Sequence, residues 1–459
     1  MAELLSASDR PEPAADVKAP RTASPGPRPA TTRPSDPWLW CLALSAIFAG
    51  LASIRLTVPS APYFDEVHYL PAARDLLSVF TGGEGAYINQ EHPLLGKTLM
   101  ALGMLLAGDN PLGWRIASLL AGTLAVGAAM RALWHASYDR FATIAFGILI
   151  ITGFHLFIHA RIAMLDIFVA AFLSLAAWQF AAACREPETG RWRLALTGVA
   201  IGLSLGTKWS AVPLAASFGL MFFGARLAGG RRRLLVSRRG IPVPGISLLD
   251  ALFLLGLLPL IVYLLTFAPG FWLSEPMRPS PLLERGLIGM HENIIALQAQ
   301  VLAPHGYQST WPQWVMNTRG IWYLYEHVDG AQRGVLLIGN PLTMLLGLPA
   351  LVYCLVTGFN RAGYAKLAAV GGYALTLGLW LIVPKPVQFY YHYVLPSIFL
   401  LAALALALAD MRKAGAPRTA YGVLAGSVLV FALFFKILTA APLDGPMSFL
   451  DWTWIEGWR

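Results

Sequence analysis

Charged side chains are scarce in this sequence of 459 residues. Asp, Glu, Lys and Arg make up 13% of the chain, whereas the hydrophobic residues make up 56%. An ordinary soluble domain contains roughly 25% charged residues, so the composition excludes a soluble globular enzyme. The net charge is +9. In a membrane protein such an excess usually lies in cytoplasmic loops, and we therefore expect no nucleic-acid partner.

Cysteine is also rare, and several well-known motifs are missing. Cys41, Cys184 and Cys354 are far apart in the sequence, which excludes both a disulfide framework and a CxxC metal site. The sequence contains no HExxH motif, no P-loop, no DxD in the loops assigned below to the outer side, and no GxGxxG followed by an acidic residue. We therefore expect neither a metal nor a cofactor.

Long apolar runs, in contrast, are abundant. A helix that crosses a bilayer needs about 20 residues, and the sequence predicts an all-α polytopic membrane protein with about eleven such helices. Two runs, 141–158 and 162–182, are separated only by His159-Ala160-Arg161, so they are the first candidates for a paired or re-entrant segment. The twelve candidate runs are 38–57, 94–108, 112–134, 141–158, 162–182, 193–207, 209–225, 247–268, 334–356, 364–383, 388–410 and 419–440.

The distribution of Arg and Lys predicts the orientation in the membrane. The loop 226–246 contains six Arg and no acidic residue, and the segments 357–366 and 411–418 are also basic. Such loops are typical of the cytoplasmic side. Counting crossings from them places the long loops 58–93 and 269–333 together on the opposite side, where they could form one site.

The two ends of the chain differ from its middle. Residues 1–37 contain eight prolines and no long apolar run, so they predict a disordered cytoplasmic tail. Residues 38–440 form the transmembrane domain, and 441–459 form a short outer tail. The sequence thus predicts a multi-pass protein of the plasma (inner) membrane, with a cytoplasmic N-terminus and a periplasmic or extracellular active site.

The first outer loop contains adjacent carboxylates in the segment Phe64-Asp65-Glu66-Val67-His68. An aspartate close to a hydroxyl nucleophile is what a general base requires. Asp65 could equally be the N-cap of a short surface helix that begins at Glu66. The spacing alone favours the cap.

Ionisable residues also interrupt the apolar runs. Lys208 lies within Gly206-Thr207-Lys208-Trp209, where hydrophobic patterning requires no cation, so it is either a site residue or a lysine that extends its ammonium to the membrane surface. Arg161 and Asp166 are expected to pair with each other or with the backbone rather than with a ligand.

Two aromatic segments have two interpretations each. One is the stretch 305–314, which contains His305, Gln308 and Trp311, and the other is 388–393, which contains His392. Aromatic and polar groups of this kind suit a sugar or peptide platform, but they are also typical of the aromatic belt at a membrane surface.

Taken together and in order, these motifs resemble the protein O-mannosyltransferase family, which are polytopic glycosyltransferases of the GT-C class. The resemblance extends from about residue 38 to 440. It depends on eight segments: Phe64–His68, Glu91-His92-Pro93-Leu94-Leu95-Gly96-Lys97, Asn110–Arg115, Arg161–Asp166, Gly206–Val212, His305–Trp314, Gly339-Asn340-Pro341 and Tyr391-His392-Tyr393. Leu94 replaces the second proline of the commoner form, a mild departure.

The resemblance implies the reaction. Mannose would move from polyprenyl-phosphate mannose to Ser/Thr hydroxyls of a secreted or membrane protein, with inversion and without a metal. The eukaryotic members carry an MIR domain in the second outer loop, and 269–333 is too short for one, which implies a bacterial-type member. A lipid-phosphate leaving group needs positive charge more than a proton donor, so one carboxylate and one or two cations suffice.

The resemblance also implies site residues. Asp65 becomes the catalytic base and Glu66 the residue that orients acceptor or donor, while Lys208 and Arg115 hold the donor phosphate. Further substrate contacts are expected at His92, Lys97, Arg161, His305, Gln308, Trp311 and His392.

Two other functions fit the pattern. A related GT-C enzyme could pass its sugar to a lipid or glycan, as aminoarabinose transferases do. A transporter would also have many spans and buried charges, but the sequence lacks evident repeated halves, and its unusual residues gather on one side.

Overall fold

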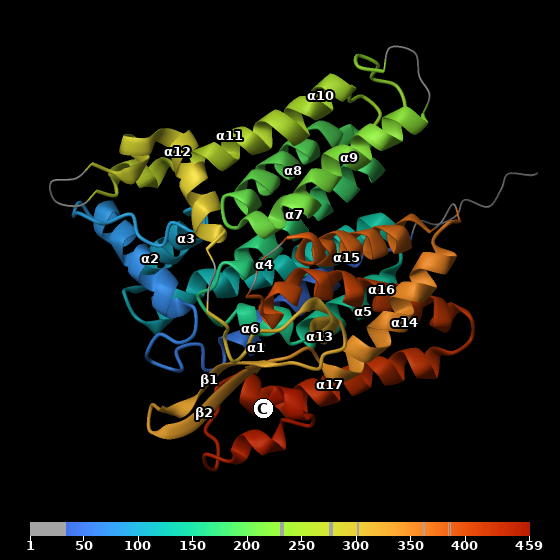
Figure 1. Ribbon diagram of the computed structural model, residues 1–459. Coiled ribbons are helices and arrows are strands. Elements are labelled where there is room, and N and C mark those ends of the chain that lie inside the picture. Colours follow the sequence, from blue (N-terminus) through green and yellow to red (C-terminus); the bar gives the residue numbers. More distant parts are fainter. Residues whose placement is uncertain are drawn as a thin grey trace, which may run out of the picture. The chain divides into compact units, whose positions relative to one another are not determined.

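The computed structural model describes residues 34–229, 234–274, 279–300, 303–360, 363–383, 385 and 387–459 (Figure 1). Residues 36–459 form one compact unit. Nearly all of the tail predicted to be disordered, 1–33, lies outside the described residues, as do three arginines of the basic loop 226–246.

The chain is mostly helical, as predicted. The helices are α1 (Trp38–Ser53), α2 (Glu66–Phe80), α3 (Leu95–Ala107), α4 (Pro111–Ser137), α5 (Arg140–Ile151), α6 (His155–His159), α7 (Asp166–Arg185), α8 (Gly190–Leu205), α9 (Val212–Ala228), α10 (Leu248–Leu252), α11 (Leu258–Leu265), α12 (Pro281–Gln298), α13 (Trp311–Val315), α14 (Pro341–Thr357), α15 (Tyr364–Ile382), α16 (Val394–Lys413) and α17 (Pro417–Leu438).

Seven of the described helical segments are long and apolar enough to cross a membrane. These are Pro111–Ser137, Asp166–Arg185, Trp209–Ala228, Leu248–Trp272, Tyr364–Ile382, Tyr390–Lys413 and Pro417–Leu438. Shorter apolar helices add Trp38–Ser53, Leu95–Ala107, Arg140–Ile151 and Pro341–Thr357. Eleven of the twelve predicted runs overlap one of these segments, and the run 193–207 overlaps α8, while the number that cross the bilayer stays a prediction.

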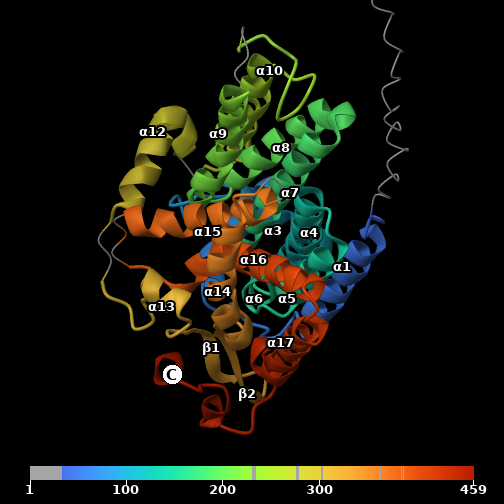
Figure 2. The same ribbon diagram turned by 90° about the vertical axis from the view of Figure 1, so that its right-hand side faces the viewer.

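The helices pack around two central members. Helix α16 is buried on almost every side and contacts α5, α14, α15 and α17. Helix α4 contacts α1, α3, α5 and α7. A helix that is apolar all round belongs in such a position, because each of its faces meets another helix (Figure 2).

The predicted run 141–158 is broken into two helices. Helix α5 ends at Ile151 and α6 begins at His155, with Phe154 between them at a positive φ of 72°. The amide of Asn340 donates hydrogen bonds to the carbonyls of Thr152, at 2.9 Å, and Ser427, at 3.1 Å. Non-helical backbone inside a membrane protein needs such partners, so the Gly339-Asn340-Pro341 motif has a structural role here.

The second outer loop contains an antiparallel hairpin that the sequence analysis missed. Strand β1 (Ile321–Val328) pairs with β2 (Ala331–Leu337), so the predicted run 334–356 was wrong at its beginning, where the chain is a strand and α14 begins only at Pro341. The C-terminal segment packs on this hairpin. The indole of Trp322 donates to the carbonyl of Trp458 at 2.9 Å, and the backbone of Leu443 donates to that of Gln332, also at 2.9 Å.

Candidate active site

Asp65 follows a strained turn at the beginning of α2. Phe64 adopts a left-handed φ of 51°, a conformation that residues with a side chain rarely adopt. Its ring stacks on Tyr323 of β1, with the centroids 4.0 Å apart, and meets the edge of Tyr391 at 6.1 Å. The hairpin therefore holds the turn that presents Asp65.

Asp65 occupies the N-cap position of α2, but its side chain makes no capping hydrogen bond. Helix α2 does begin at Glu66, as the cap interpretation required, yet it continues to Phe80 rather than forming a short helix. The geometry thus gives the carboxylate of Asp65 no capping function.

The surroundings of Asp65 make it a stronger base than an ordinary aspartate. Burial raises the pKa of its carboxyl from 3.8 to about 6, against the opposing effect of Lys208. Asp166 raises this pKa further, whereas His68 and Lys385 lower it. Lys208 and Lys385, which come from two different segments, thus both act electrostatically on this carboxylate.

Lys208 pairs with Asp166 at the beginning of α7. Its ammonium lies 3.0 and 2.9 Å from the two carboxylate oxygens, and both side chains are buried. The same ammonium lies 5.2 Å from the centre of the Tyr391 ring. Lys208 and Phe64, the residue before Asp65, therefore contact the same tyrosine. The partner of Asp166 is Lys208 and not Arg161, so of the two expected alternatives only the pairing of Arg161 with the backbone is found.

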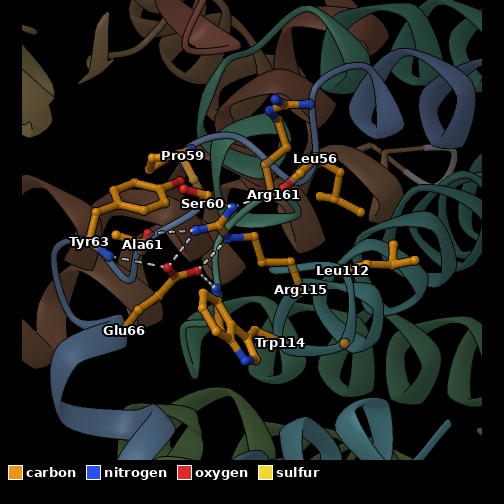
Figure 3. A network of polar contacts seen from close by, with 12 residues as sticks. Leu56, Pro59, Ser60, Ala61, Tyr63, Glu66, Leu112, Trp114, Arg115 and Arg161 are labelled. Atoms are coloured by element: carbon orange, nitrogen blue, oxygen red, sulfur yellow. Dashed lines mark hydrogen bonds and ion pairs between the residues drawn. The ribbon is translucent and has the colours of Figure 1, made fainter. Parts of the chain in front are cut away.

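Glu66 and Arg115 form a second ion pair, in which both side chains are fully buried (Figure 3). The guanidinium donates to both carboxylate oxygens of Glu66 at 2.8 Å. Its other hydrogens bond the carbonyls of Leu56 at 3.0 Å, Pro59 at 2.8 Å and Ala61 at 3.3 Å. All five N–H groups of Arg115 are thereby used within the protein.

The carboxylate of Glu66 is saturated as well. It accepts the backbone N–H of Ala163 at 2.9 Å and that of Tyr63 at 3.2 Å, in addition to the two bonds from Arg115. We call Glu66, Arg115 and the loop residues 56–61 the clamp. The clamp fixes the first outer loop onto α4 and onto the segment before α7, and it leaves neither charge open to a phosphate.

Two further predicted site residues bind the backbone. Arg161 donates to the carbonyl of Ala52, to that of Ile54 at 2.7 Å and to that of Arg55 at 3.2 Å. The ammonium of Lys97 is bound by the carbonyls of Asn89, at 2.5 Å, and His92, at 3.0 Å. Arg161 therefore holds the end of α1, and Lys97 holds the loop 58–93, rather than facing a ligand.

His92 lies nearer the centre of the site. Burial lowers the pKa of its imidazole well below the usual value, and the positive charges of Lys208, Lys97 and Lys385 lower it further. Its Nδ1 lies 3.3 Å from the amide nitrogen of Gln298 in α12, so both outer loops meet here. His92 is thus neutral at physiological pH.

The aromatic segments differ in exposure. His305, Gln308 and Trp311 are exposed, whereas His392 is buried, and its ring lies 3.7 Å from that of Trp380. A chain of rings links the exposed part to the site: His305 contacts Phe389 at 5.3 Å, and Phe389 stacks on Tyr391 at 5.4 Å. A row of ring contacts thus leads from the stretch 305–314 to Tyr391, beside the ammonium of Lys208.

Two residues around the site, Tyr323 and Lys385, escaped the sequence analysis, as did the pairing of Asp166 with Lys208. Tyr323 lies in the hairpin, and its hydroxyl is 3.2 Å from Nε2 of His159. Lys385 lies among the prolines of 384–386, where a cation beside an outer turn was the available signal.

No group of three or more His, Cys, Asp or Glu side chains within the described ranges could hold a metal ion.

Comparison with known proteins identifies relatives. Residues 108–274 match the family model described as "Dolichyl-phosphate-mannose-protein mannosyltransferase". A protein of Mycobacterium tuberculosis (strain ATCC 25618 / H37Rv), named polyprenol-phosphate-mannose–protein mannosyltransferase, is 28% identical over 91% of this chain and 90% of its own length. A protein of the same name from Corynebacterium glutamicum is 26% identical over 92% of this chain and 94% of its own.

Solved structures confirm the predicted GT-C fold. The S. cerevisiae protein O-mannosyltransferase Pmt1-Pmt2 complex bound to the sugar donor has a TM-score of 0.76 at 14% identity, covering 92% of each chain. ArnT from Cupriavidus metallidurans, bound to undecaprenyl phosphate, has a TM-score of 0.55 at 13% identity, covering 87% of this chain and 76% of its own.

Proposed function

Because this chain is related to the protein O-mannosyltransferase family, as its motifs predicted, we propose that it transfers mannose from polyprenyl-phosphate mannose to hydroxyl groups of Ser and Thr in secreted or membrane proteins. The observation that carries the proposal is the position of Asp65. Its carboxylate is not used as a helix cap, has a raised pKa, and lies where two lysines act on it.

In the proposed reaction Asp65 is the base. The acceptor oxygen forms a bond to the anomeric carbon while the bond from that carbon to the phosphate oxygen breaks on the opposite face, which inverts the configuration. The hydroxyl proton passes to the carboxylate of Asp65, and polyprenyl phosphate leaves. A base with a pKa of about 6 is ionised at neutral pH and still takes up a proton well.

Positive charge stabilises the leaving phosphate. We assign this part to Lys208 and Lys385, because both act on the carboxylate of Asp65. Burial lowers the pKa of Lys385 to about 8, which leaves it protonated at neutral pH. Arg115, the other cation expected to bind phosphate, would first have to release the first outer loop, so we reassign it and Glu66 to positioning.

Substrate recognition falls to the surface between the two outer loops. His305, Gln308 and Trp311 are exposed there and suit contacts with an acceptor peptide, whereas His92 and His392 lie deeper and suit the sugar. The reaction as proposed uses no metal and no cofactor, and the lipid-linked sugar is a co-substrate.

The protein spans the inner membrane with its N-terminus in the cytoplasm, in our proposal, and the Asp65 site faces the periplasm or the exterior. The basic loop 226–246 supports this orientation. In intact cells, a cysteine introduced at Gln308 should react with an impermeant reagent, while one at Arg239 should not. Equal labelling of both would contradict the orientation.

The decisive test of the function is label transfer. Purified protein is incubated with radiolabelled polyprenyl-phosphate mannose and a membrane extract that contains both proteins and lipids. The proposal predicts label in protein, released by treatment that cleaves O-linked sugars. Label in lipid alone would instead favour an aminoarabinose-transferase-like acceptor and would overturn the proposal.

A further inference from the structure

An apolar groove lies between three helices. It has a volume of about 360 Å³ and is lined by side chains from α1, α5 and α17. Its walls include Trp40, Phe141, Ile144, Tyr421 and Val428. Helix α5 contacts both α1 and α17, the helices that provide the rest of the lining. The volume falls in the range of sites that hold small apolar ligands.

Cations surround one end of the groove. The guanidinium of Arg412, at the end of α16, lies 4.9 Å from the centre of the Phe141 ring. Phe141 in turn meets the ring of Tyr421 edge-on at 5.6 Å. Arg140 and Arg418, at the beginnings of α5 and α17, are exposed at the same end as Phe141 and Tyr421.

Two aspartates at this end, Asp139 and Asp410, form ion pairs with lysines. Lys413 lies 2.6 Å from Asp139 and 3.9 Å from Asp410, and Lys366 lies 2.5 Å from Asp410. The two lysines thus balance the two aspartates, and the charges of Arg412 and Arg418 add to the positive charge at this end. The amino ends of α5 and α17 add their partial positive charge.

We infer that this groove binds an anionic phospholipid, with an acyl chain between α1, α5 and α17 and the phosphate at Arg412 and Arg418. Charge complementarity selects an anionic lipid, since a zwitterionic headgroup would bring its own cation to the arginines. The apolar walls match a chain that runs along α5 and α17. Asp65 and its cations take no part in this site, so the inference is independent of the proposed function.

Native mass spectrometry of the purified full-length protein tests the site. The protein, in a mild detergent, is titrated with dioleoyl phosphatidylglycerol or with dioleoyl phosphatidylcholine, which has the same chains. We expect one phosphatidylglycerol to remain bound under conditions that remove phosphatidylcholine. Equal retention of the two lipids would overturn the inference, because the groove would then hold ordinary bilayer lipid.

Variants locate the headgroup. The double variant Arg412→Gln/Arg418→Gln should weaken the binding of phosphatidylglycerol about thirtyfold, as each arginine near a lipid surface contributes about fivefold. The control Arg238→Gln/Arg239→Gln removes the same charge from another exposed loop and should leave binding unchanged. An equal loss of phosphatidylglycerol affinity in the control would contradict the site, because removing positive charge anywhere on the protein would then weaken binding to the same extent.

Two further variants protect the test against misfolding. Arg418→Gln keeps the contact between Arg412 and Phe141 and should give a smaller loss in the same direction. Ala425→Phe fills the groove without changing any charge and should reduce retention of phosphatidylglycerol to that of phosphatidylcholine. Full retention in Ala425→Phe, with an unchanged unfolding temperature, would show that the chain does not occupy the groove.

Discussion

Asp65 and Glu66 are neighbours in the sequence, yet their carboxylates lie in opposite surroundings. Glu66 is fully buried and saturated by Arg115 and two backbone N–H groups. Asp65 is partly exposed, makes no capping bond and has a pKa of about 6. The comparison teaches that Glu66 holds the loop in place while the carboxylate of Asp65 is left without a capping bond. Our proposal assigns positioning to Glu66 and proton transfer to Asp65 on this difference.

The largest effect on stability is expected from the clamp. Arg115→Ala leaves the Glu66 carboxylate buried without its partner, and breaking a buried pair in this way costs about 3–5 kcal/mol. Thermal unfolding of the purified variant measures the loss. Arg74→Ala is the control, because the Arg74–Asp109 pair is exposed and should contribute at most about 1 kcal/mol. Similar losses in both variants would show that the clamp is an ordinary surface contact.

A smaller effect is expected on donor binding. Lys385→Ala should weaken the affinity for polyprenyl-phosphate mannose about tenfold, because a charged contact with phosphate is lost. Lys208→Ala should weaken it too and Lys208→Arg should retain part, since either cation can face a phosphate. Lys436→Ala, which removes an exposed lysine of α17, is the control.

Lys208→Ala also leaves Asp166 unpaired, so the double variant Lys208→Met/Asp166→Leu separates the two roles. Donor affinity equal to that of the unmodified protein in this double variant would assign Lys208 to the fold alone.

The pH dependence of turnover tests the proposed role of Asp65, with a smaller expected effect than the variants above. Protonation of Asp65 removes the base, so kcat/KM should fall about tenfold per pH unit below about 6 and level off above it. Steady-state rates between pH 4.5 and about 8 measure this. A profile that stays flat down to about pH 5 would mean that Asp65 is not the base.

The smallest effect concerns the cap. Asp65→Ala should leave stability at neutral pH unchanged or slightly higher. The carboxyl ionises near 3.8 when unfolded and near 6 when folded, so the folded state holds the proton more tightly, and stability falls as the pH rises through this window. Replacing Asp65 by alanine removes the carboxyl and with it this loss of stability at neutral pH. Asn110→Ala is the control: its side chain accepts from Leu112 and Gly113 as the cap of α4, and its loss should cost about 1 kcal/mol.

The sequence predicted what depends on local pattern. Apolar runs located the helices, and the motifs around Asp65 and Lys208 marked the residues that we propose as the site, because both signals lie within a few residues. The partnerships lie far apart in the chain: Glu66 and Arg115 are separated by 49 residues, and Asp166 and Lys208 by 42. Helix and strand periodicities relate residues only a few positions apart, so they could not identify Arg115 as part of the clamp.

The hairpin was missed for a different reason. Residues 321–324 and 333–337 are buried continuously, without the alternation that marks a strand with one exposed face. The second strand also lies next to the apolar α14, so the pattern extended the predicted helix backwards. Tyr323, which positions Phe64, was hidden with it.

Turnover of Asp65→Asn tests the central claim most directly. Asparagine keeps the shape of the side chain and loses its basicity, so kcat should fall on the order of 10²–10⁴-fold while donor affinity and unfolding temperature stay close to those of the unmodified protein. All three quantities are measured on one purified sample with polyprenyl-phosphate mannose and a peptide acceptor. Near-normal turnover in that sample would contradict the assignment of Asp65 as the base.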